Sequence, residues 1–174
     1  RSGLQRGLTT AHKLAKKIIV PFCPESELSG IGVKDFMLAV WYRRTVKLPE
    51  AWSGKRVLLH FGAVDYAAWV WINGKKAGSH RGGYTPFALE VTNLLQEDKN
   101  TITVYVKDDT RSLRQASGKQ CRDFYSRGCH YTRTTGIWQT VWMEAVPTTY
   151  IADVKMTPDL EGGRLFIEAK VVGG

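Results

Sequence analysis

The sequence predicts an all-β protein built as an antiparallel sandwich or jelly roll. Two runs, 56–61 and 101–107, alternate apolar and polar residues with the period of two that is typical of half-buried strands. Gly, Pro and Asn residues separate the strand-like runs at short intervals, and no amphipathic segment of helical length interrupts them. Many short strands divided by turn residues favour a sandwich or barrel over a helical or α/β fold.

The strands can be placed in order along the chain. From composition and alternation we expect them at 36–48, 56–61, 67–72, 86–91, 101–107 and 136–146. Trp69 and Trp71 lie two residues apart, so their side chains point to the same face of the third of these strands. We expect both to pack in the core or against another domain.

Turn residues follow the aromatic strand directly. Asn73-Gly74 is the dipeptide that tight type I′ hairpins require, because both central residues take a positive φ. We therefore expect a hairpin over 69–79. Gly82 and Gly83 are expected to form a corner, since glycine takes a positive φ without steric cost.

A second domain is predicted to begin near residue 148. Pro147 closes the strand at 136–146, and a strand-like run, a Gly-Gly turn and another strand-like run follow. We assign 1–147 to one β domain and 148–174 to the first strands of another. Because the last run continues almost to the end of the chain, we expect a piece cut from a longer protein.

The stretch 108–135 has few regular apolar repeats and is rich in Arg, Gly, Ser and Gln. An irregular segment of this length inside a compact domain is usually functional or disordered. Its aromatic and histidine side chains favour an ordered, functional loop; they are Phe124, Tyr125, His130 and Tyr131.

The formal charge of +9 raises the question of a polyanionic partner. The basic residues concentrate in the N-terminal segment and in 111–133, where six of them face a single acid, Asp123. No nucleic-acid-binding motif accompanies either concentration, so we favour a solvated or anion-tolerant surface over a nucleic-acid interface.

Cysteine usage and hydropathy place few further constraints. The three cysteines form neither a C-x-x-C pair nor an even set, so we expect free thiols. A Cys121–Cys129 disulfide is the alternative in an oxidising compartment. No apolar run approaches the roughly 18 to 20 residues that span a bilayer. We expect a soluble protein of cytoplasmic, periplasmic or secreted location.

No complete active site is recognisable. Hydrolysis of a glycosidic bond needs two carboxylates at defined separation, and the Asp and Glu residues lie mostly in turns and at strand edges. Motifs for nucleophilic, phosphate or zinc chemistry are absent from the sequence, so we assign no catalytic residue, metal ligand or cofactor. Carbohydrate binding requires less, because sugars pack on aromatic rings and bond to Arg, Asn, Gln and His.

One series of motifs resembles a known family. The segments are VDYAAWVWINGKKAGSHRGGYTPFALEVTNLL, NTITVYVKDDT and YTRTTGIWQTVWMEAVP. In this order they resemble the N-terminal sugar-binding domain of glycoside hydrolase family 2, the group of β-galactosidases, β-glucuronidases and β-mannosidases. The resemblance runs from about Ile18 to Pro147 and is specific, because several motifs agree in sequence and in order.

The resemblance implies a galactose-binding-like jelly roll, then an immunoglobulin-like sandwich, then a (β/α)₈ barrel that carries both catalytic glutamates. This chain would hold the first domain and the opening strands of the second, and it would be inactive alone. The family's aromatic first strand is not evident before Ile18. If that strand has been cut away, we expect an exposed sheet edge and lower stability.

The resemblance also implies a set of substrate-binding residues. Family members carry a carboxylate six positions before the Gly of the Gly-Ile-aromatic motif; here that glycine is Gly136 and the position holds His130. A histidine donates to a sugar hydroxyl but is not an acceptor-only anion, so the sugar preference is expected to differ. The remaining candidates are nearby Gln120 and Arg133, and Glu25 and Ser26 in the loop VPFCPESELSGIG.

The sequence therefore predicts a noncatalytic sugar-binding-fold domain that shapes the substrate pocket of a family 2 glycoside hydrolase. Its partners would be a β-glycoside and the missing sandwich and barrel domains, with no nucleic acid and no membrane. Two alternatives stay open. One is an autonomous carbohydrate-binding module, and the other is a structural domain whose loop 111–133 docks in an oligomer.

Overall fold

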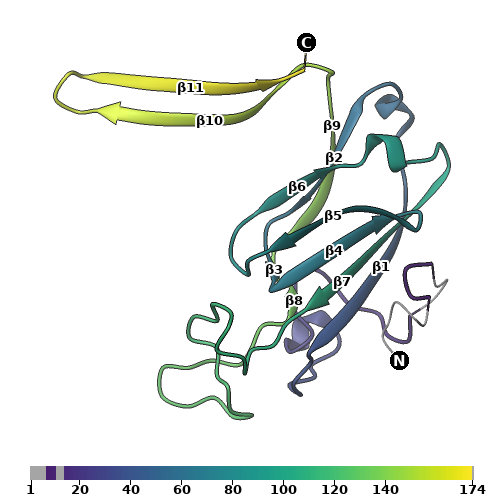
Figure 1. The fold of residues 1–174 in the computed structure, drawn as a ribbon, viewed down its shortest axis with the longest axis vertical. Helices are drawn as coiled ribbons and strands as arrows, with labels where there is room; N and C mark the ends of the chain where they lie inside the picture. The colour runs from purple at the N-terminus through teal and green to yellow at the C-terminus, as the bar shows by residue number, and fades with distance from the viewer. Residues whose placement is uncertain (1–6, 11–13, 174) are drawn as a thin grey trace.

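The computed structural model describes residues 7–10 and 14–173, which form two packed β-sheets and a separate C-terminal hairpin (Figure 1). The larger sheet has the order β1-β7-β4-β5 and the smaller one β6-β2-β9; a short pair, β3-β8, completes the sandwich. All pairings in these sheets are antiparallel, which confirms the predicted class. The strands are β1 Ala39–Lys47, β2 Arg56–Phe61, β3 Val64–Asp65, β4 Ala67–Ile72, β5 Lys75–Arg81, β6 Phe87–Glu90, β7 Lys99–Lys107, β8 Gly136–Ile137 and β9 Val141–Val146.

The predicted alternation forms the core between the two sheets. Val57, Leu59 and Phe61 of β2 are buried against Val70 of β4 and Val104 of β7. Full burial of such a side chain contributes about 1.5 to 3 kcal/mol, so these rows hold the sandwich together. Helical structure within 7–10 and 14–173 is limited to three short 3-10 turns, η1 Glu27–Ser29, η2 Glu50–Trp52 and η3 Thr92–Leu94.

The segment 136–146, predicted as one strand, is two. β8 pairs with β3, whereas β9 pairs with β2. Gly136 takes a φ of 80°, and the backbone between the strands turns so that the N–H of Gly62 donates to the carbonyl of Thr140 at 2.9 Å. The periodic pattern alone could not reveal this change of partner.

The hairpin predicted over 69–79 is confirmed as β4 and β5. Its turn residues Asn73 and Gly74 have φ of 51° and 80°, as a type I′ turn requires. The Asn73 amide also bonds inward: Nδ2 donates to the carbonyl of Leu94 at 2.9 Å and to Oδ1 of Asn100 at 2.8 Å, and Oδ1 accepts from the N–H of Thr101 at 2.9 Å. Asn73 therefore ties the turn to the start of β7.

We expect Asn73→Ala to lower the free energy of unfolding by about 2 kcal/mol, because three hydrogen bonds are lost and Asn100 keeps an unpaired acceptor site. Urea unfolding of the purified chain would measure this. Asn93→Ala, which removes an exposed amide from the nearby η3 turn, is the matched control and should change stability by less than about 0.5 kcal/mol. Equal losses in the two variants would contradict the role assigned to Asn73.

The tryptophan pair lies on the outer face of the larger sheet. Trp69 and Trp71 alternate with buried Val70 and Ile72, so the prediction that they enter the core is wrong. The ring of Trp69 stacks on Tyr105 with centroids 5.3 Å apart, and Tyr105 stacks on Trp41 at 4.6 Å. These rings use their faces against each other, and packing of this row against another domain stays a prediction.

Strands β1 and β9 lie at the outer edges of their sheets. Between them a cavity of about 820 Å³ reaches the core side chains Leu59, Phe61 and Met143. None of residues 14–17, which precede Ile18, is in a strand. Both sheet edges therefore border this cavity.

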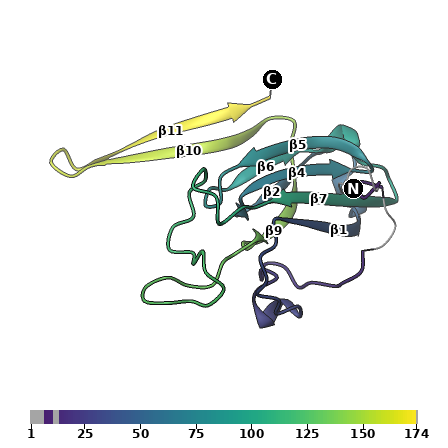
Figure 2. The same cartoon turned by 60° about the horizontal axis from the view of Figure 1, so that its bottom comes forward.

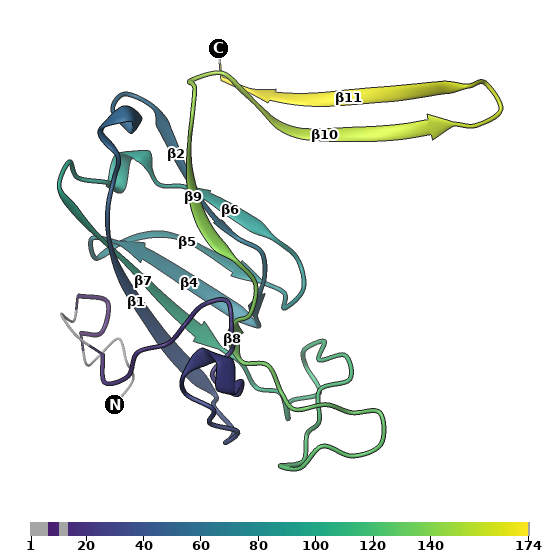
Figure 3. The same ribbon diagram turned by 180° about the vertical axis from the view of Figure 1, so that it is seen from behind.

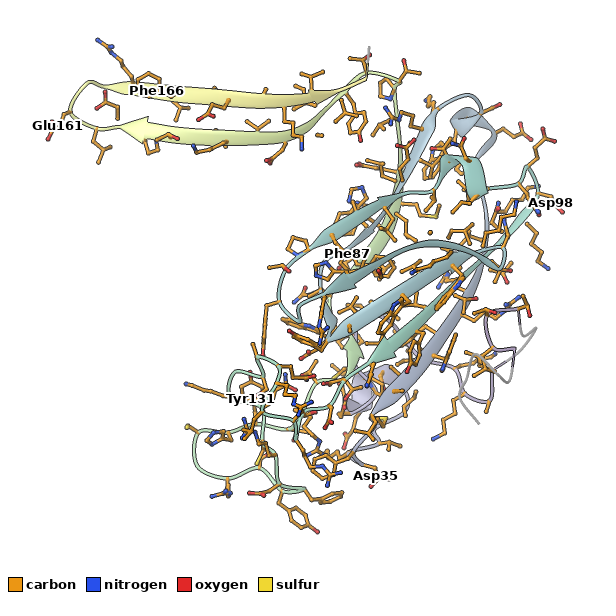
Figure 4. All side chains as sticks on the ribbon, viewed as in Figure 1. Asp35, Phe87, Asp98, Tyr131, Glu161 and Phe166 are labelled. Atoms are coloured by element: carbon orange, nitrogen blue, oxygen red, sulfur yellow. The ribbon has the colours of Figure 1, made fainter. Side chains whose placement is uncertain are left out.

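The C-terminal part forms a hairpin of β10 (Tyr150–Asp159) and β11 (Arg164–Val172) that leaves the sandwich (Figures 1 and 3). Phe166 and Glu161 lie toward its far end (Figure 4). The hairpin exposes large apolar side chains, among them Ile151, Met156 and Phe166. Its assignment to a second, immunoglobulin-like domain stays a prediction.

Candidate functional site

The predicted site residues gather at one end of the sandwich, where two irregular segments meet. One is the N-terminal segment 19–35, and the other is the β7–β8 loop, residues 108–135. Figure 4 labels Asp35 and Tyr131 from these segments at the same end of the molecule, and Figure 2 turns this end toward the viewer. The N–H of Thr135 donates to Oε2 of Glu25 at 3.2 Å and joins the two segments directly.

A pocket of about 410 Å³ lies between the two segments. Its lining includes Glu25, Ser26 and Arg133, so three of the five predicted substrate-binding residues come together. Cys23, Lys34, Thr132 and Thr134 contribute further polar groups. Ser26 is fixed by the local chain, because its Oγ caps η1 by accepting from the N–H of Leu28 at 3.3 Å.

Arg133 is almost completely buried and fastens the loop to the N-terminal segment. Its Nη1 donates to the carbonyl of Asp123 at 2.8 Å, and its Nη2 donates to the carbonyl of Lys34. The guanidinium lies over the ring of Phe36, 4.0 Å from its centroid. Nε is buried and has no hydrogen-bond partner among the residues that the structure describes.

Glu25 contributes an acceptor. Oε2 accepts from the N–H of Thr135, and the buried Oε1 has no hydrogen-bond partner among residues 7–10 and 14–173. Burial raises the pKa of Glu25 above its ordinary value, and the hydrogen bonds from Thr135 oppose this shift. The carboxyl can therefore donate to a hydroxyl when protonated and accept from it when ionised.

Gln120 lies beneath the pocket, outside its lining. Nε2 donates to Oδ2 of Asp65 at 2.7 Å, and Oε1 accepts from the N–H of Thr134 at 2.8 Å. Both ends of the buried amide are engaged by the protein. In this structure Gln120 orders the backbone beside Arg133.

His130 lies apart from the pocket on the tip of the β7–β8 loop, residues 122–131, where every residue is exposed. Its backbone N–H donates to the carbonyl of Arg127 at 3.0 Å, and Nδ1 of its ring lies 3.9 Å from Sγ of the neighbouring Cys129. His130 is free to contact a ligand or another domain. Cys129, Cys121 and Cys23 are free thiols in this structure.

Comparison with known proteins identifies this domain. Residues 27–147 match the family described as "Glycosyl hydrolases family 2, sugar binding domain", which covers more than half of the chain. The chain belongs to glycosyl hydrolases family 2. Both the fold and the resemblance inferred from the sequence motifs are thereby confirmed.

Relatives of this family 2 domain are several times longer than the chain. It is 31% identical over 128 residues to a β-galactosidase of Thermoanaerobacter pseudethanolicus, covering 72% of this chain and 16% of that protein. It is 27% identical over 156 residues to a β-glucuronidase of Paenibacillus borealis, covering 82% of this chain and 25% of the relative. The chain therefore spans about a quarter or less of these relatives.

Solved structures agree. The β-glucuronidase of Bacteroides uniformis is similar with a TM-score of 0.55 and 33% identity, covering 68% of this chain and 13% of that one. A β-glucuronidase of an uncultured Clostridium superposes with a TM-score of 0.68 at 26% identity, covering 97% of this chain and 30% of that one. The β-glucuronidase of Ruminococcus gnavus superposes with a TM-score of 0.75 at 20% identity, covering 99% of this chain and 31% of that one, and supports the fold.

The family 2 domain offers hydrogen-bonding groups at this end of the sandwich. Within residues 7–10 and 14–173, no three His, Cys, Asp or Glu side chains are placed to hold a metal ion. The same part of the chain contains no helix long and apolar enough to cross a membrane. The donors and acceptors of the pocket suit a hydroxyl-rich ligand.

Sequence reasoning missed three residues of this region. Asp65 is buried against Gln120 of the β7–β8 loop, and Asp108 is buried at the start of that loop. Tyr42 is buried beside Gly136, where its Oη accepts from the N–H of Ile137 at 3.3 Å. The available signal was Asp65 itself, a lone carboxylate within the apolar run 63–72. Buried carboxylates require partners, so an acid at such a position indicates a polar contact from elsewhere.

Proposed function

We propose that this chain is a noncatalytic sugar-binding domain that shapes the substrate pocket of a β-glycosidase. The observation that carries the proposal is the meeting of Glu25, Ser26 and Arg133 in one pocket of a family 2 sugar-binding domain. Similarity to a β-galactosidase and to β-glucuronidases supports a β-glycoside as the ligand class.

Each group has a distinct role in this proposal. Arg133 and Glu25 order the polar base of the pocket, and each keeps one buried atom, Nε and Oε1, without a partner among the described residues. Ser26 and Lys34 complete the polar wall. His130 extends the contact surface beyond the pocket, where it donates to a hydroxyl of the same or a neighbouring sugar unit.

Bond cleavage is assigned to other parts of a longer enzyme. We assign 1–147 to the sugar-binding domain and the hairpin in 148–174 to the start of an immunoglobulin-like sandwich. The catalytic carboxylates would lie on a barrel that follows. The chain alone should therefore not release nitrophenol from nitrophenyl glycosides, and turnover by the purified chain would refute its noncatalytic role.

Substitution of His130 tests the proposed contact without a folding cost, because this side chain is exposed. In the longer enzyme we expect His130→Ala to raise KM by about threefold to tenfold, the loss of roughly one hydrogen bond. Steady-state kinetics with nitrophenyl glycosides would measure it. Lys119→Ala, which removes an exposed side chain from the same loop, is the matched control.

Unchanged kinetics in His130→Ala would remove His130 from the site. Titration of this chain with mono- and oligosaccharides by calorimetry distinguishes a domain that needs the rest of the enzyme from an autonomous carbohydrate-binding module. We expect weak or no binding, because the pocket is completed by other domains. Saturable binding by the chain alone would favour an autonomous carbohydrate-binding module.

A further inference from the structure

Three buried carboxyl groups contact the β7–β8 loop: two come from outside the loop and one, Asp108, is its first residue. They come from separate parts of the chain: Glu25 precedes η1, Asp65 ends β3, and Asp108 follows β7. Their exposed fractions are 3%, 1% and 1%. Each has one oxygen that is bonded to a residue of the loop and a second oxygen with no protein partner, namely Glu25 Oε1, Asp65 Oδ1 and Asp108 Oδ2.

Glu25 and Asp65 bind the loop from outside it, and Asp108, the first residue of the loop, binds Gln115 within it. Asp65 Oδ2 accepts from the Gln120 amide at 2.7 Å, Asp108 Oδ1 accepts from the Gln115 amide at 2.6 Å, and Glu25 Oε2 accepts from the Thr135 N–H at 3.2 Å. Each glutamine also bonds to the backbone: Gln115 Oε1 accepts from the N–H of Asp109, and Gln120 Oε1 accepts from the N–H of Thr134. The attachment points thus flank the segment that carries His130 and Arg133.

We propose that Glu25, Asp65 and Asp108 are positioning residues that hold the β7–β8 loop in the conformation that presents Arg133 and His130. The functional consequence rests on the proposed sugar-binding role. The positioning itself concerns only this chain and can be tested without a ligand.

No cation neutralises the three carboxyls. Within residues 7–10 and 14–173, the ion pairs of Lys, Arg and His involve other acids. Arg133 lines the same pocket as Glu25, yet two of its nitrogens are bonded to carbonyls and its face lies on Phe36. Lys34 also lines the pocket of Glu25, but it is exposed, and no ion pair joins it to Glu25 within the described residues. The remaining titratable groups that act on the carboxyls add no positive charge; they are Cys23, Tyr42, Tyr84 and Asp109.

Like charges that are buried together favour proton uptake. Burial raises the pKa of Asp65 to about 7; the charges of Asp108 and Glu25 add to this shift, and the Gln120 hydrogen bond opposes it. Burial also raises the pKa of Asp108 to about 6; the hydrogen bond from Gln115 opposes this shift, and the charges of Glu25 and Asp109 add to it. Near neutral pH the group therefore retains protons that exposed carboxyls would have lost.

The direction of the pH effect follows from these shifts. A carboxyl whose pKa is raised while the loop is in place binds its proton more tightly there than when the loop has detached or the chain has unfolded. Its stabilising contribution is complete below the ordinary carboxyl pKa of about 4 and is lost as the pH rises through about 6 to 7. The loop should be held most firmly in mild acid and loosen above neutral pH.

Amide hydrogen exchange of the chain tests this inference. We follow Thr134 and Thr135, whose N–H groups donate to Gln120 and Glu25. Their protection factors should fall by about tenfold or more between pH 5 and pH 8, since one pKa unit corresponds to a factor of ten. Asp65→Asn keeps an acceptor for Gln120 but does not ionise, so it should remove most of this fall.

Two further variants complete the design. Asp108→Asn should reduce the fall in the same way and replaces Asp65→Asn if that variant does not fold. Asp98→Asn removes an exposed carboxyl that lies away from the loop (Figure 4) and should keep the wild-type pH dependence.

Flat protection in the wild type, or an unchanged fall in both Asn variants at the loop, would overturn the inference. Protection that behaves as expected, in a longer enzyme whose kinetics do not respond to His130→Ala, would leave the positioning intact and refute the sugar contact of His130.

Discussion

Replacing Gly136 by alanine is expected to lower the free energy of unfolding by about 3 to 5 kcal/mol. Gly136 has a φ of 80°, in the left-handed region that costs other residues roughly 1 to 2 kcal/mol. An added Cβ would overlap Oη of Tyr42 and lie 3.0 Å from Cγ2 of Val40. Overpacking of this kind costs about 1 to 3 kcal/mol more. It would also displace the hydroxyl that accepts from the N–H of Ile137.

Urea unfolding of the two proteins, followed by tryptophan fluorescence, would measure the difference. Gly128→Ala is the matched control, because Gly128 also has a positive φ, of 55°, but an added Cβ would meet nothing within 4 Å. It should cost only the backbone share, about 1 kcal/mol. If both variants lost the same stability, the close approach of Tyr42 would have no energetic weight.

Arg133→Ala should give the second large effect, a loss of about 3 kcal/mol that falls mainly on the β7–β8 loop. The change removes two charge-assisted hydrogen bonds and the contact with Phe36. Each such hydrogen bond contributes about 1.5 to 3 kcal/mol, and water that reaches the freed carbonyls offsets part of the loss. The buried volume of the side chain is lost as well. Arg133→Lys should restore only part of the loss, because lysine lacks the planar fork.

Calorimetric unfolding and hydrogen exchange over residues 119–135 would measure both variants. Arg127→Ala is the control on the same loop: it removes an exposed ion pair to Asp123, which water screens, so its loss of stability should be much smaller than that of Arg133→Ala. A similar loss in Arg127→Ala, or full rescue by Arg133→Lys, would contradict the role assigned to the buried guanidinium.

Much of the sandwich was predictable because local pattern and burial agree. The alternation in 56–61 and 101–107 became β2 and β7, and Asn73-Gly74 became the turn of the β4–β5 hairpin. Trp69 and Trp71 were misplaced because alternation tells which residues share a face, but not which face meets the core. Beside them, Val70 and Ile72 take the core side.

The candidate site was predictable only in part. The family resemblance selected Glu25, Ser26 and Arg133, which line one pocket although Glu25 and Arg133 lie 108 positions apart (133 − 25). The buried carboxyls were not predicted, because their environment depends on side chains that the fold brings from distant segments. Asp65 meets Gln120 across 55 positions. Neither residue shows this pairing in its local sequence.

The tip of the β7–β8 loop is attached to the protein largely through main-chain atoms. The N–H of Cys121 donates to the carbonyl of Tyr131, Arg133 bonds the carbonyl of Asp123, and the Cys121 thiol bonds that of Tyr125. Side chains at 122–130 can therefore be exchanged with little change in the path of the chain. Natural variation and deliberate grafting can both act here, and a new recognition surface can evolve while the sandwich is left untouched.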